Sequence, residues 1–167
     1  SGYDRNNKTQ ISAQAFYSEV LKGKNYISEP IKWNALSDMT IVAAAPVKQN
    51  NVVKGLIYLK INAGMLSDIT NQIKISNTNR AYMIGSSGNI IAHWNPEYIN
   101  KKVKTSDLMK NDPSLQQLVA LEEKLLAGET GYGFCSYDGV DQIAAYAPVD
   151  DNLGWGVVVI AEKAEFM

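Results

Sequence analysis

An internal repeat constrains the fold of this chain more than any single motif does. Two segments of the first half have counterparts in the same order in the second half: VLKGKNY (20–26) with LLAGETGY (125–132), and AAAPVKQNNVVKGLIYLKI (43–61) with AAYAPVDDNLGWGVVVIAE (144–162). Pro46 aligns with Pro148, and Gly55 aligns with Gly156. An ordered set of matches at similar spacing indicates a duplicated structural unit.

Each copy begins with a segment of helical periodicity that ends in a glycine. In ISAQAFYSEVLKG (11–23) the apolar residues recur close to helical spacing, and the final glycine is typical of a helix C-terminus. DPSLQQLVALEEKLLAG (112–128) shows the same pattern more clearly, with Asp112 as the N-cap and Pro113 at the first helical position. We therefore expect one helix before the strands of each unit.

The remaining apolar segments predict antiparallel strands. Five segments are separated by short polar turns: MTIVAAAPV (39–47), VVKGLIYLKI (52–61), GYGFCSYDG (131–139), DQIAAYAPV (141–149) and WGVVVIAE (155–162). Strands that are joined by turns this short must be antiparallel neighbours. The predicted fold class is therefore α+β, with two modules that each consist of an antiparallel sheet flanked by helices.

The second unit opens with a predicted hairpin that has no counterpart in the first. AYMIG (81–85) and NIIAHW (89–94) are two apolar runs around a Ser-Gly turn. The repeat places the equivalent hairpin upstream of Ser1, so we expect the first unit to lack its N-terminal helix and hairpin. In a rival interpretation, residues 1–10 form a shortened edge strand. The expected domains are residues 1–75 and 76–167.

Composition limits the classes of function. A net charge of -1 and the absence of any Lys/Arg run argue against a nucleic-acid partner. No apolar segment approaches the length needed to span a bilayer. The single cysteine and the single histidine, His93, provide no metal-ligand spacing, and no cofactor motif is present. We interpret His93 as a structural residue at a strand end, so an enzyme is the weakest hypothesis.

The repeated motifs resemble the double Cache family, the tandem PAS-like extracellular sensor domains of bacterial chemoreceptors and sensor histidine kinases. The resemblance rests on the helix, Ala-Pro-Val hairpin and closing-strand motifs, and it covers nearly the whole chain. It implies a membrane-distal module followed by a membrane-proximal one. It also implies an extracellular or periplasmic location, and the membrane helices and signalling domain of a parent receptor as partners.

The resemblance also implies a ligand site in the first module. Amino-acid-binding members carry an Arg-x-Trp/Phe-Tyr pattern on the helix, and this chain has Gln14, Phe16 and Tyr17 at those positions. Family members place an aspartate, which receives the ligand's ammonium group, where this chain has Lys60. Both charged partners of a free amino acid are thus replaced, which favours an organic anion as ligand.

Strand periodicity gives Lys60 independent weight. Alternation in LIYLKI puts Tyr58 and Lys60 on one face of the strand. With Phe16, Tyr17 and Trp33 they would form an aromatic site with one ammonium group. Two alternatives stay open. Lys60 could instead extend into water from a strand end, and Asp38 could pair with Lys60 or face a ligand amine.

The sequence thus favours an extracellular ligand-sensing domain of a chemoreceptor that binds a small solute in its first module, without catalysis and with a homodimer as an open option. A histidine-kinase sensor is the alternative output. A different class of function is an interaction module that recognises a periplasmic or cell-wall protein.

Overall fold

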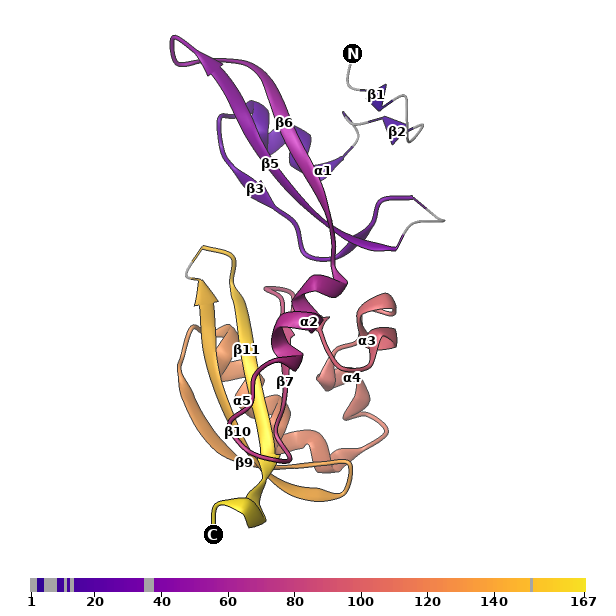
Figure 1. Ribbon diagram of the computed structural model, residues 1–167, viewed down its shortest axis with the longest axis vertical. Helices are drawn as coiled ribbons and strands as arrows, with labels where there is room; N and C mark the ends of the chain where they lie inside the picture. Colours follow the sequence, from indigo (N-terminus) through magenta and orange to yellow (C-terminus); the bar gives the residue numbers. More distant parts are fainter. Residues whose placement is uncertain (1–2, 5–8, 11, 13, 35–37, 151) are drawn as a thin grey trace. The chain divides into compact units, whose positions relative to one another are not determined.

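A computed structural model shows that the chain divides into two compact units (Figure 1). The structure describes residues 3–4, 9–10, 12, 14–34, 38–150 and 152–167. Unit 1 comprises Ser1–Ala63 and unit 2 comprises Gly64–Met167. Contacts therefore divide the chain before the boundary that was expected between residues 75 and 76, because the intervening helix packs on strands of unit 2.

The sheet of unit 1 is built around one long central strand. The described elements are β1 (Tyr3–Asp4), β2 (Thr9–Gln10), α1 (Ala15–Leu21), β3 (Tyr26–Ile27), β4 (Ile31–Lys32), β5 (Met39–Gln49) and β6 (Val52–Asn62). Strand β5 pairs antiparallel with β3, β4 and β6, whereas β1 and β2 pair with each other in a separate two-stranded sheet. In the described part of residues 1–10, these two strands do not extend the main sheet as the rival interpretation expected.

Turn chemistry explains the boundaries of these elements. Asn50 and Asn51 have φ angles of 50° and 63°, which is the left-handed pair that a two-residue hairpin turn requires. Gly23 has a φ angle of 88° just after α1, where a residue with a Cβ would be strained. Both the hairpin and the glycine-terminated helix are thus confirmed in unit 1.

Unit 2 has a five-stranded antiparallel sheet in the order β8-β7-β11-β10-β9. Its elements are α2 (Gly64–Asn71), β7 (Arg80–Ile84), β8 (Ile90–Ala92), α3 (Pro96–Asn100), α4 (Thr105–Leu108), η2 (Pro113–Leu115), α5 (Gln116–Leu126), β9 (Gly131–Tyr137), β10 (Val140–Asp150), β11 (Trp155–Glu162) and η3 (Lys163–Glu165). The predicted hairpin at its start is confirmed as β7 and β8. Asp112 accepts the backbone N–H of Ser114 at 3.1 Å, as expected of an N-cap. The α+β class is confirmed in both units.

Helix α5 packs closely on the inner face of the sheet of unit 2. Leu118, Leu121 and Leu125 are buried in a core with residues of all five strands of this sheet. A Cβ on Gly156 would lie 2.5 Å from the Leu125 side chain. The glycine is therefore required by the close approach of helix and sheet. None of the helices in the described ranges is long and apolar enough to cross a membrane.

The strand register shows which residues of the two units are equivalent. Pro46 pairs with Leu56 in unit 1, whereas Pro148 pairs with Gly156 in unit 2. The alignment of Gly55 with Gly156 was therefore wrong by one position. Irregularities lie at different points of the two hairpins, between Val47 and Lys48 in one and between Pro148 and Asp150 in the other.

The corrected register aligns the inward-facing residues of β6 and β11. Tyr58 pairs with Ala44 and Lys60 with Val42, at the positions where Val158 pairs with Tyr146 and Ile160 with Ala144. Unit 1 thus has an aromatic residue and a cation where unit 2 has two apolar core residues.

Candidate functional site

An aromatic cluster fills the inner face of unit 1. The rings of Phe16 on α1, Trp33 after β4 and Tyr58 on β6 lie within contact of one another. The ring centroids are 6.2 Å apart for Phe16 and Trp33, 5.5 Å for Phe16 and Tyr58, and 5.7 Å for Trp33 and Tyr58. Phe16 and Trp33 are buried, while Tyr58 is half-buried. Three of the predicted site residues therefore share one core.

Lys60 joins this cluster from the same face of β6. Strand alternation points Tyr58 and Lys60 in one direction, and the Lys60 Nζ atom lies 5.1 Å from the centroid of the Trp33 ring. An ammonium group at this distance from an indole face is attracted by the ring quadrupole. Lys60 is nevertheless exposed as a whole. Its ammonium group is both held by the cluster and open to a solute. We call Phe16, Trp33, Tyr58 and Lys60 the aromatic–lysine cluster.

The indole nitrogen of Trp33 is a buried donor without an acceptor. Trp33 is 5% exposed, and its Nε1 atom has no hydrogen-bond partner among the described residues. A buried donor that lacks a partner costs about 1–3 kcal/mol. Such an atom is expected where a bound group completes the hydrogen bonding.

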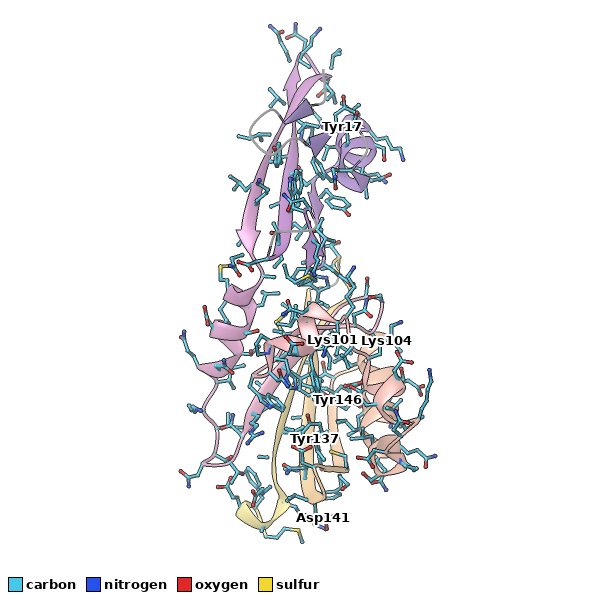
Figure 2. The ribbon with its side chains drawn as sticks, turned by 90° about the vertical axis from the view of Figure 1, so that its right-hand side faces the viewer. Tyr17, Lys101, Lys104, Tyr137, Asp141 and Tyr146 are labelled. Atoms are coloured by element: carbon cyan, nitrogen blue, oxygen red, sulfur yellow. The ribbon has the colours of Figure 1, made fainter. Side chains whose placement is uncertain are left out.

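The other predicted site residues lie outside the cluster. Gln14 is the residue before α1, and its carbonyl accepts the Tyr17 backbone N–H at 3.0 Å. Tyr17 lies on α1 (Figure 2) and is half-buried, with no ring contact to the cluster among the described residues. Asp38 is exposed and forms no ion pair with Lys60 in this part of the structure.

Sequence reasoning missed Tyr26 as a member of the cluster. Tyr26 on β3 pairs with Ala44, and its ring lies 6.3 Å from that of Phe16. The available signal was its position three residues after Gly23, where the chain must turn back onto the sheet. Tyr26 thus forms part of the wall of the cluster.

The structure shows His93 to be a structural residue. Its Nδ1 atom accepts the backbone N–H of Asn95 at 2.9 Å, and its ring stacks on Trp94 and Tyr98 with centroids 3.7 and 4.4 Å away. Burial lowers the pKa of His93 to about 4, so the ring is neutral at physiological pH. This arrangement matches the interpretation from the sequence.

The chain offers little support for catalysis or for a metal site. Burial raises the pKa of the Cys135 thiol to about 11, which keeps it protonated and unreactive. Within the described residues, no group of three or more His, Cys, Asp or Glu side chains is placed to hold a metal ion. Unit 1 instead brings together aromatic rings, a buried indole N–H donor and one ammonium group.

Comparison with known proteins gives a consistent family and fold. A family model described as the Cache domain matches residues 2–167. The ligand-binding domain of the Pseudomonas aeruginosa PAO1 amino acid chemoreceptor PctB, in complex with L-Arg, has a TM-score of 0.70 at 16% identity over 98% of this chain and 65% of that one. The ligand-binding domain of the Pseudomonas fluorescens chemoreceptor CtaA, in complex with L-serine, has a TM-score of 0.71 at 13% identity over 97% and 66%.

A third similar structure belongs to another class of receptor. The extracellular domain of mmHK1S-Z3, a protein assigned as a histidine kinase, has a TM-score of 0.67 at 18% identity over 87% of this chain and 51% of that one. This chain therefore spans about half to two thirds of the length of these structures. A search of curated proteins found no match.

Proposed function

Because the chain belongs to the Cache domain family, we propose that it is the extracellular ligand-sensing part of a transmembrane chemoreceptor. In this proposal unit 1 is the membrane-distal module, and it binds a small organic anion on the aromatic–lysine cluster. Unit 2 is the membrane-proximal module. Bound ligand shifts a two-state equilibrium of unit 1, and unit 2 passes this shift to the membrane helices of the receptor.

The unpartnered indole N–H of Trp33 carries this proposal. It is a buried donor that needs an acceptor, and the ammonium group of Lys60 lies over the same ring. A carboxylate that accepts from the indole N–H gains the attraction of the nearby cation at the same time. The half-buried ring of Tyr58, which packs against the buried ring of Phe16, supplies apolar surface for the rest of a small ligand.

The charges of the cluster favour an organic anion over a free amino acid. An α-amino acid needs an anionic partner for its ammonium group, and the cluster contains Lys60 but no acidic residue. PctB and CtaA are seen with L-Arg and L-serine. This chain has Gln14 and Lys60 at the positions from which we expect an amino-acid site to take its charges. We therefore place its ligand in the class of small carboxylates.

Unit 2 serves as an internal reference for this proposal. Its positions equivalent to Tyr58 and Lys60 are Val158 and Ile160, which are 1% and 3% exposed. A duplicated fold is therefore stable with apolar residues at both positions. The replacement of a core isoleucine by an exposed lysine in unit 1 supports a role in recognition.

A thermal-shift screen of organic acids, amino acids and amines tests the proposal. A ligand that binds only the folded state stabilises it by RT ln(1 + L/Kd), where L is the ligand concentration, so the melting temperature rises with the logarithm of ligand concentration above Kd. We expect small carboxylates to stabilise the chain and Lys60→Ala to abolish that effect while the fold stays intact. Lys54→Ala, on the same strand and also exposed, is the matched control. Equal stabilisation of Lys60→Ala and the parent protein would remove Lys60 from the site.

Two outcomes of the screen would favour a different ligand or a different class of function. Stabilisation by amino acids with no response to carboxylates would overturn the anion assignment. An intact domain that no solute stabilises would support an interaction module that recognises a periplasmic or cell-wall protein. The sequence of the attached signalling domain separates a chemoreceptor from a histidine kinase.

A further inference from the structure

Unit 2 contains a small cavity on the inner face of its sheet. Its volume is about 120 Å³, and its polar lining residues are Thr78, Arg80, Tyr137, Asp138, Gln142 and Glu162. Tyr137 lies on β9, on the lower part of unit 2 in Figure 2. All of these residues belong to unit 2, so the cavity is independent of the aromatic–lysine cluster.

The placement of helix α5 explains why this space is not filled. The helix covers the part of the sheet where Gly133 and Gly156 allow close contact with Leu121 and Leu125. The cavity lies toward the other end of the strands, where Gln142 pairs with Glu162. At that end the inner face is lined by polar side chains.

Gln142 is a buried polar residue on the wall of the cavity. It is 8% exposed and lines the cavity from β10, between the buried core and the cavity rim. Its side-chain amide offers one acceptor and one donor group, so it can complete the hydrogen bonding of a polar occupant of the cavity.

Charges of both signs line the same cavity. The guanidinium group of Arg80 lies 5.2 Å from the centroid of the Trp94 ring, and no carboxylate of the described residues pairs with it. Asp138 and Glu162 contribute carboxylates to the lining, and neither forms an ion pair in that part of the chain. Two carboxylates and one guanidinium group would disfavour a simple anion. They suit a ligand that carries one positive and one negative group.

We propose that this cavity is a second ligand site that takes a small zwitterion of the size of glycine. Arg80 binds the carboxylate of the ligand, Glu162 accepts from its ammonium group, and the Gln142 amide completes the hydrogen bonding. The volume admits a ligand of only a few heavy atoms. Unit 2 therefore responds to a solute of different charge from the anion proposed for unit 1.

Titration of the whole chain by 15N-resolved NMR tests this site with three probes: glycine, acetate and methylamine. Glycine is expected to shift the amides of Arg80, Gln142 and Glu162 in a saturable way. Acetate carries only the negative charge of glycine and methylamine only the positive one, so each is expected to bind more weakly than glycine. The amides around Lys60 report on unit 1 in the same spectra. Binding at the cavity of unit 2 can therefore be distinguished from binding at the aromatic–lysine cluster of unit 1.

Two variants separate the two ends of the ligand. Arg80→Met keeps the stem of the side chain, and it is expected to weaken glycine and acetate about tenfold or more without weakening methylamine. Glu162→Gln is expected to weaken glycine and methylamine without weakening acetate. Lys124→Met, in the last turn of α5 and outside the cavity, is the matched control.

The shift pattern decides the outcome. Loss of the glycine response in Arg80→Met and Glu162→Gln, but not in Lys124→Met, would support the site. Absence of saturable glycine shifts at the cavity, in a chain whose spectrum shows that it is folded, would overturn it. Equal responses of all three variants would also overturn it.

Discussion

The long hairpins of the two units, β5–β6 and β10–β11, pair equivalent residues on their inner faces, but the side chains on those faces differ in character. Counted back from Gly23 and Gly128, Phe16 corresponds to Leu121, and its neighbour Tyr17 corresponds to Glu122. In unit 2 the helix residues belong to a closed core, whereas in unit 1 the helix covers aromatic rings and an exposed lysine. One fold thus carries a mostly aliphatic core in unit 2 and an aromatic cluster beside an exposed cation in unit 1.

The difference lies in what fills the space between helix and sheet. Unit 2 has Leu125 on the helix above Gly156 on the strand, whereas unit 1 has Val20 above Leu56. In unit 2 the large helix residue packs directly on a glycine of the strand. In unit 1 the larger side chain is on the strand and the smaller one is on the helix. Variants that exchange the residues at equivalent positions therefore test whether this difference in packing distinguishes the units.

The largest effect is expected when unit 2 receives the strand residue of unit 1. Gly156→Leu would force a side chain into the space of Leu125, whose nearest atom is 2.5 Å from a Cβ at that position. We expect a loss of about 4 kcal/mol or more in the free energy of unfolding of unit 2. Urea unfolding followed by the indole signals of Trp94 and Trp155 measures it.

Gly55→Ala is the control for this prediction. A Cβ at Gly55 would meet no atom within 4 Å, so the variant is expected to leave stability within about 0.5 kcal/mol. If Gly156→Leu were as stable as Gly55→Ala, the close packing of α5 would not distinguish the units.

The second prediction exchanges the residues at the equivalent strand position. Ile160→Lys places an ammonium group at a position that is 3% exposed, and we expect a loss of about 3 kcal/mol. Lys60→Ile changes an exposed residue, and we expect a stability change within about 1 kcal/mol. Denaturant unfolding of both variants checks the pair. Equal losses would show that Lys60 is part of the structural core.

The third prediction concerns the buried carboxyl group that replaces Tyr17 in unit 2. Glu122 Oε1 accepts the hydroxyl groups of Tyr82 at 2.6 Å and Thr105 at 2.7 Å, and burial raises the pKa of this carboxyl group. Glu122→Leu leaves both hydroxyl groups without this acceptor and is expected to cost about 2 kcal/mol. Glu122→Gln keeps an acceptor and removes the cost of burying a charge, so its stability at neutral pH should equal or exceed that of the parent. A Gln variant as unstable as the Leu variant would contradict this account.

The smallest effect is a pH dependence that is confined to unit 2. The pKa of His93 is lowered from 6.5 to about 4 by burial, so the unfolded chain binds a proton between these values that the folded chain does not. Unit 2 should therefore lose about 1–2 kcal/mol as the pH falls from 6.5 toward 4. His93→Phe keeps a stacked ring and should remove this part of the pH slope. An unchanged slope in that variant would assign the dependence to other groups.

The sequence predicted the strands well because their signals are local. Alternation and paired turn residues defined β5, β6 and β11 to within two residues of the observed bounds. The placement of Tyr58 and Lys60 on one face followed from the same alternation and is confirmed by the register. Local periodicity was also sufficient to place Gly23 at the end of α1.

Features that depend on tertiary packing could not be predicted in the same way. The shift of Gly156 relative to Gly55 arises from irregularities in the two hairpins that leave no trace in the residue pattern. The buried N–H of Trp33 depends on how the segment after β4 packs beneath α1, which no periodicity encodes. The chain division at Ala63 likewise depends on the packing of α2 on unit 2.

The indole N–H signal of Trp33 tests the proposed anion site most directly. The chain has three tryptophans, so three indole signals are expected in a 15N-resolved spectrum, and each reports on its own environment. A bound carboxylate that accepts from Trp33 Nε1 should move its proton signal downfield in a saturable way and leave those of Trp94 and Trp155 in place. Lys60→Ala should abolish that shift. A small carboxylate that stabilises the chain without moving the Trp33 indole signal would contradict the account.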